Sequence, residues 1–107
     1  MGDSGAYVLE GSQTIREGER RIPVVSWIDF DTVSTGGTEL FVNGSTDSAN
    51  WLSGTSVVSG NTLTCPTVTI PAGFGGITAV LEAAVISNSQ TWKVGIVFNV
   101  LKPGAQR

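Results

Sequence analysis

The residues best suited to chemistry are few, because the 107-residue chain contains no histidine. Without histidine, Ser-His-Asp and Cys-His catalysis are excluded, and most zinc sites are excluded with them. Cys65 is the one cysteine, and no basic residue lies near it in sequence to stabilise a thiolate. We therefore expect Cys65 to be a small buried apolar side chain, with no intramolecular disulfide and no enzymatic activity in the chain.

Two aspartates form the clearest pattern for a metal ion. Asp29 and Asp31 alternate at the end of an expected strand, so their side chains share one face. Calcium takes about six to eight oxygen ligands, and Asp47 or Glu39 could add to the pair. The alternative is a solvated loop edge, which needs no partner. We favour the loop edge and expect no metal and no cofactor.

Three tryptophans could supply the flat apolar surface on which a sugar ring stacks. Trp27 falls within an expected strand, and sandwich domains commonly bury a tryptophan in this way. Trp51 lies in a turn-rich stretch, residues 48–54, and is the one that we expect to be exposed. A carbohydrate-binding or adhesive module that uses Trp51 is therefore an alternative function.

The elements that would position these residues are strands rather than helices. Charged residues make up only 14% of the chain and glycine occurs 14 times, a composition that suits strands and tight turns. Gly and Asn recur about every ten residues, which is typical of a sandwich or a barrel. We expect one all-β domain, an immunoglobulin-like antiparallel β-sandwich of about seven strands.

The expected domain covers residues 12–103, with a flexible N-terminal arm over 1–11 and a C-terminal tail over 104–107. The expected strands are residues 12–17, 21–30, 38–42, 55–58, 62–70, 77–86 and 90–101, with a short piece at 50–52. The apolar pattern changes parity at Pro66, where we expect a bulge or a bend. The expected core residues are Ile15, Val25, Trp27, Leu40, Val42, Val57, Leu63, Leu81, Val94, Ile96 and Phe98.

The last two expected strands form a C-terminal hairpin, residues 77–101, that is apolar on both faces. A sheet that faces water should carry polar residues on its outer side, so a covered surface is one explanation. Scattered surface aliphatics are also ordinary, and this explanation stays open. The residues that we expect to contact a neighbouring protein are Val80, Ala84, Ile86, Val97 and Leu101.

The charge of the chain limits its partners. The net charge is −3, the pI is about 4.6, and the sequence contains no run of Lys and Arg. Nucleic acid and anionic membrane surfaces are therefore not expected as partners. The N-terminus lacks the pattern of a signal peptide, and no apolar run approaches the roughly 20 residues that span a bilayer. We expect a protein made in the cytoplasm without export.

Several segments resemble small immunoglobulin-like domains of tailed-bacteriophage virion proteins. The run TIREGE at residues 14–19 is similar to their opening strand and turn. LFVNG at 40–44 and SVVSGNTLT at 56–64 are similar to their middle strands, and QTWKV at 90–94 with VLKP at 100–103 to their final strand. The resemblance implies a non-enzymatic structural protein of the virion, in head decoration, a connector or the tail. It also implies homo- or hetero-oligomeric contacts with other virion proteins.

Overall fold

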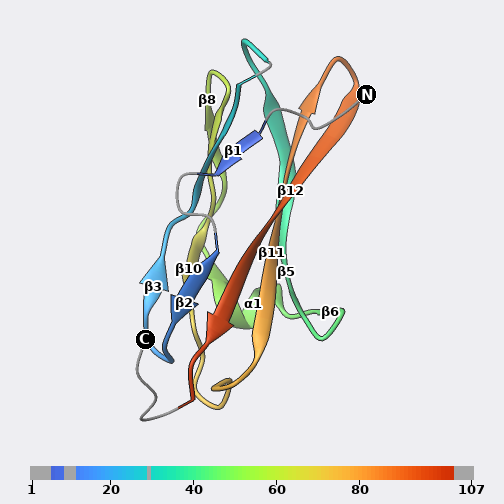
Figure 1. Ribbon diagram of the computed structural model, residues 1–107. Helices are drawn as coiled ribbons and strands as arrows, with labels where there is room; N and C mark the ends of the chain where they lie inside the picture. Colours follow the sequence, from blue (N-terminus) through green and yellow to red (C-terminus); the bar gives the residue numbers. More distant parts are fainter. Residues whose placement is uncertain (1–5, 9–11, 29, 103–107) are drawn as a thin grey trace.

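The computed structural model describes residues 6–8, 12–28 and 30–102, and strands dominate it (Figure 1). The all-β prediction is confirmed for this part of the chain. The elements in chain order are β1 (Ala6–Val8), β2 (Gln13–Ile15), β3 (Arg20–Arg21), β4 (Val24–Trp27), β5 (Ser34–Val42), β6 (Ser45–Thr46), α1 (Ser48–Trp51), β7 (Leu52–Ser53), β8 (Val57–Ser59), β9 (Thr62–Thr64), β10 (Thr67–Thr69), β11 (Thr78–Ser87) and β12 (Gln90–Val100).

The largest sheet has five strands in the order β2-β12-β11-β5-β6. Strands β11 and β12 form the predicted C-terminal hairpin, and their turn places Asn88 and Ser89 at positive φ angles of 53° and 62°. Both central residues at positive φ are the mark of a type I′ turn, which suits the twist of a hairpin. Strand β2 runs parallel to β12, whereas the other pairs are antiparallel.

Two smaller sheets, β1-β4-β9-β8 and β3-β10-β7, lie on the other side of the core (Figure 1). Strands β9 and β10 are consecutive parts of one stretch that is interrupted at Cys65 and Pro66. The interruption restores one inward face, because Leu63 before it and Val68 after it are both buried. The predicted bend at Pro66 is confirmed, and proline suits it because it has no backbone N–H to donate to a ladder.

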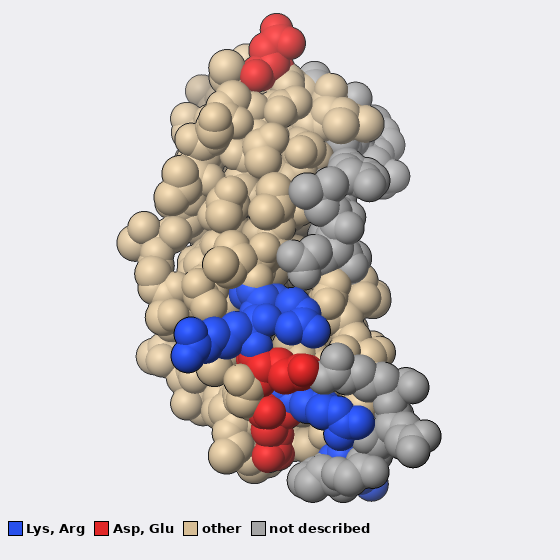
Figure 2. All heavy atoms as spheres, turned by 90° about the vertical axis from the view of Figure 1, so that its left-hand side faces the viewer, with Lys and Arg blue, Asp and Glu red and all other residues tan. Residues whose placement is uncertain are grey.

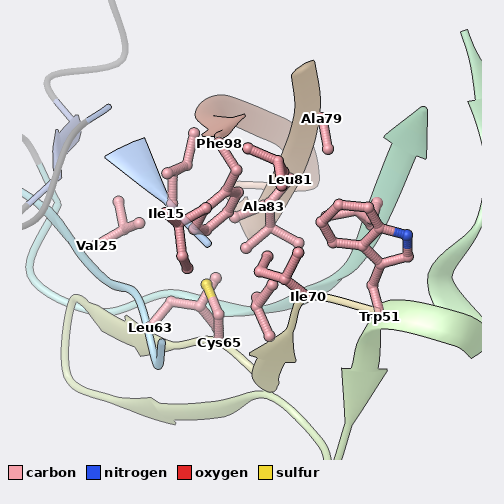
Figure 3. Packing of buried hydrophobic residues seen from close by; sticks show 14 of the residues in the cluster. Ile15, Val25, Trp51, Leu63, Cys65, Ile70, Ala79, Leu81, Ala83 and Phe98 are labelled. Carbon is pink, nitrogen blue, oxygen red and sulfur yellow. The ribbon is translucent and has the colours of Figure 1, made fainter. Parts of the chain in front are cut away.

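Buried side chains from all three sheets meet in one apolar cluster (Figure 3). Leu81 and Phe98 of the large sheet pack above Leu63 and Cys65 of the opposite side. Most of the predicted core residues belong to this cluster, but Val57 does not, since 59% of it is exposed. In the register of β8 it is Val58 that lies opposite the buried Leu63, and a shift by one residue reverses the face.

Two other segments differ from the prediction. The piece at 50–52, predicted as a strand, is instead the end of helix α1 followed by β7. Residues 6–8, placed in a flexible arm, form β1 and pair with β4, while the rest of the arm and the tail at 104–107 lie outside the described residues. Within the described part of the chain, no helix is long and apolar enough to cross a membrane.

Candidate functional site

The candidate site is the outward face of the five-stranded sheet, where the sequence predicts a protein contact. From Ala79 to Val85 of β11 the residues at odd positions are buried, so the residues at even positions point to the opposite face. The predicted parity of the hairpin is therefore confirmed. What the sequence alone does not give is the register of β5 and β12 against β11, which decides which outward side chains are neighbours.

Three apolar side chains lie side by side on this face. Val80 pairs with Val97 of β12 and with Phe41 of β5, and all three are partly exposed. We call Phe41, Val80 and Val97 the apolar row. A polar row borders it, in which Thr78 Oγ1 lies 3.2 Å from Asn99 Oδ1 in a hydrogen bond. Phe41 was not predicted as a contact residue, although it lies between the predicted core residues Leu40 and Val42 and should therefore face outward.

On the other side of the apolar row, two carboxylates lie opposite each other. Glu82 of β11 pairs in register with Glu39 of β5. Like charges in directly opposed positions destabilise a sheet. Lys93 offsets part of this repulsion, because its Nζ lies 3.3 Å from Glu82 Oε1 and forms an ion pair. Glu39 is exposed and forms no ion pair within the described residues. We call Glu39 and Glu82 the acidic row.

Beside the acidic row the face is hollowed by small residues. Gly36, Gly37 and Ala84 line a shallow depression together with Glu39, Glu82 and Lys93. The β5 backbone lies close to β11 here, since a Cβ on Gly36 would lie 3.0 Å from the Ala84 carbonyl carbon. The register of the pair also shifts between Ala84 and Val85. Ala84, predicted as a contact residue, is consequently only 5% exposed and offers a partner little area.

The five predicted contact residues do not form one patch. Val80 and Val97 are direct cross-strand neighbours. Ile86 is 39% exposed but lies six residues further along β11, about 20 Å from Val80 at roughly 3.3 Å per residue. Leu101 follows the end of β12 on the opposite side of the apolar row. The structure thus joins Val80 and Val97 to Phe41 and separates them from Ile86 and Leu101.

The prediction that Trp51 is exposed is wrong, since the residue is only 1% exposed. Helix α1 directs the indole into the end of the core (Figure 3). There it contacts Phe74, with ring centroids 5.1 Å apart. Its Nε1 donates a hydrogen bond to Asp47 Oδ2 over 2.9 Å. No ring face remains for a sugar, so carbohydrate binding through Trp51 is excluded. The sequence feature that could have predicted this contact is the spacing of four residues between Asp47 and Trp51, because side chains so spaced meet on a helical turn.

The predicted aspartate pair can be described only in part. Asp31 is exposed, whereas Asp29 lies outside the described residues. Among the residues that the structure describes, no group of three or more His, Cys, Asp or Glu is placed to hold a metal ion. Cys65 is buried in the apolar cluster, as predicted.

On the side formed by the smaller sheets, most charged side chains gather in one part of the surface (Figure 2). Its lower part gathers Lys and Arg with Asp and Glu between them, while most of the described surface above is uncharged. The cations that follow β2, form β3 and follow β12 make up what we call the basic patch: Arg16, Arg20, Arg21 and Lys102. The sequence did not reveal the whole patch because the fold adds Lys102 to the three arginines of residues 16–21.

Exposed aliphatic residues also occur away from the large sheet. Ile22, Ile28 and Val57 are each at least half exposed, and they adjoin the strands β3, β4 and β8 of the smaller sheets. Ile22 and Ile28 lie at strand ends rather than in one row. They match the ordinary pattern of single surface aliphatics, and so they serve here as reference positions for substitutions.

Comparison with protein-family models, with curated proteins and with solved structures finds no match. The function must therefore be inferred from the arrangement of this chain's own residues.

Proposed function

We propose that the chain is an immunoglobulin-like β-sandwich that serves as a non-enzymatic structural component of a tailed-phage virion. The strand order supports the fold. The order β1-β4-β9-β8 corresponds to strands A, B, E and D of the immunoglobulin pattern, and β12-β11-β5-β6 corresponds to G, F, C and C′. The strands β3 and β10, which precede β4 and follow β9 in the chain, form a separate small sheet with β7.

The observation that carries a structural role is the apolar row on the outward face of the large sheet. Phe41, Val80 and Val97 are consecutive across three strands, at positions where a sheet facing water carries polar side chains. Burying such a row is worth roughly 25 cal/mol per Å² before the costs of association. The resemblance of the sequence to phage domains assigns the partner: another virion protein of the capsid, the connector or the tail.

The test places lysine in the apolar row and follows incorporation into particles. Val80→Lys/Val97→Lys should leave the domain folded, because both side chains point away from the core, and should abolish its attachment. Val57→Lys is the matched control, since it charges an exposed valine on the opposite side. Gold-labelled antibody on purified particles, read by negative-stain microscopy, should detect the wild type and the control but not the double variant.

Two results would contradict the proposal. Wild-type label that never coincides with particles would exclude a virion role. Label that is retained equally by Val80→Lys/Val97→Lys would move the contact elsewhere, and residues 1–11 would be the next segment to test. Circular dichroism of each variant shows whether the fold is intact before the particles are examined.

A further inference from the structure

The charges of the described residues are segregated. Four of the five described cations belong to the basic patch, and the carboxylates Glu17 and Glu19 lie between Arg16 and Arg20 in the chain. Glu17 is already engaged, because its Oε2 accepts hydrogen bonds from the backbone N–H groups of Gly73 and Gly75. Among the described cations, the fifth, Lys93, is the only one on the outward face of the large sheet, where it pairs with Glu82, whose cross-strand neighbour is Glu39. One surface thus has an excess of cations and another an excess of acids.

We propose that the outward face of the large sheet binds the basic patch of a second copy of this chain. The inference uses the same face as the proposed function and adds the identity of one partner. The acidic row would accept Arg20 or Arg21 of the neighbour, and the apolar row would cover their aliphatic stems. The complementarity of charge between the two surfaces selects this occupant over an unrelated apolar segment.

The local geometry suits an arginine. Arg20 is exposed, and among the described residues its guanidinium forms no ion pair. The depression beside Glu39 is lined by Gly36 and Gly37, which leave room for an incoming side chain. A guanidinium can bind a carboxylate through two parallel hydrogen bonds, while its methylene stem lies on apolar surface. Glu39, which has no ion pair among the described residues, and the nearby Val80 offer both kinds of contact.

The contact joins two different surfaces of the same molecule, so it is heterologous. Such contacts generate rings when the rotation closes and open chains when it does not, rather than a symmetric dimer. A stable interface buries at least roughly 1,000 Å² and the rows here are narrow, so we expect weak association. Exposed ion pairs are screened by salt, so the association should also be strongly salt-dependent.

Sedimentation velocity of the complete chain at several concentrations tests the inference. In about 50 mM salt the wild type should form species larger than a dimer as its concentration rises, and about 500 mM salt should return it to the monomer. Glu39→Gln/Glu82→Gln and Arg20→Gln/Arg21→Gln should each weaken self-association about tenfold or more. Ile28→Gln is the control, because it changes an exposed side chain outside both surfaces.

Mixing the two double variants gives the decisive result. Each lacks one of the two surfaces, so an equimolar mixture retains a single productive contact and should stop at a 1:1 dimer. A wild type that stays monomeric at millimolar concentration in low salt would overturn the inference. Association that is unaffected by salt or by the four substitutions would overturn it as well, and so would a mixture that does not associate.

These outcomes separate the inference from the proposed function. If the wild type is found on particles but stays monomeric in solution, the self-contact is wrong and the virion role stands. If the chain self-associates as described but is never found on particles, the virion role is wrong and the self-contact stands. A monomer whose basic patch instead retains it on immobilised heparin would assign that patch to a polyanion and overturn the self-contact.

Discussion

The indole of Trp51 is buried and donates its Nε1–H to the Asp47 carboxylate over 2.9 Å. A hydrogen bond to a charged acceptor contributes about 1.5–3 kcal/mol to stability. Trp51→Phe keeps an aromatic ring against Phe74 but loses this bond. We expect the substitution to lower the free energy of unfolding by about that amount, measured by urea denaturation.

Trp92→Phe is the matched control for that measurement. The Nε1 of Trp92 is buried but has no hydrogen-bond partner within the described residues, and its ring packs 5.3 Å from Phe30. Removing an unsatisfied donor costs no hydrogen bond. Trp51→Phe should therefore be at least about 1 kcal/mol more destabilising than Trp92→Phe. Equal losses would mean that ring volume, rather than the bond to Asp47, accounts for the effect at Trp51.

At the scale of elements, the approach of β5 to β11 depends on Gly36. A Cβ at this position would lie 3.0–3.1 Å from the backbone and Cβ of Ala84. The chain cannot relieve this contact by moving a flexible side chain, so the two strands must shift. We expect Gly36→Ala to destabilise the domain by about 1–3 kcal/mol, measured from urea unfolding curves.

Gly95→Ala is the control for the same sheet. Gly95 lies on the neighbouring strand β12, and its added Cβ would meet Val80 Cγ1 at an ordinary 3.4 Å. Alanine restricts the unfolded chain more than glycine, so this change should be neutral or stabilising by up to about 1 kcal/mol. Similar losses at both positions would show that the β5–β11 approach has no special demand for glycine.

The elements also show where sequence reasoning succeeds. The final hairpin was predictable because two long β-branched segments flank a short Ser-Asn-Ser turn, and the bend at Pro66 because the apolar parity reverses there. The predictions that Trp51 is exposed and that Val57 is buried were wrong for different reasons. Helix α1 is too short to produce a helical period, and a three-residue strand such as β8 leaves its face undetermined by pattern alone.

The candidate site was predictable only as a face. Parity along β11 and β12 identified Val80 and Val97 as outward residues, but pairing with β5 adds Phe41 and Glu39. That pairing joins segments about forty residues apart in the chain, and no local pattern specifies it. The complete basic patch could not be predicted for the same reason, since Lys102 is distant in the chain from the arginines of residues 16–21.

At the scale of the whole molecule, Cys65 reports on the integrity of the core. It is 2% exposed and lies in the cluster where side chains of all three sheets meet (Figure 3). A buried thiol reacts only when the surrounding structure opens. We expect a thiol reagent to label native protein only through global unfolding, with an opening free energy within about 1 kcal/mol of the urea value.

The measurement compares native labelling rates with those of the unfolded chain in urea, at several reagent concentrations. Val80→Lys/Val97→Lys should label at the wild-type rate, because its substitutions lie outside the core. Rapid labelling of native wild-type protein would contradict the buried position of Cys65 and show that one sheet separates from the others without global unfolding.

The parallel pairing of β2 with β12 has a consequence for mechanical load. Strand β2, the second strand of the domain, and β12, its last strand, lie side by side, joined by bonds such as Leu101 N–H to Ile15 O at 2.8 Å. In a parallel pair, tension between the chain ends pulls the two strands past each other along their length. Their hydrogen bonds must then break together rather than one after another. Tension applied in this direction would thus load the β2–β12 pair in shear, and rupture would follow the rate of forced unfolding rather than the equilibrium stability.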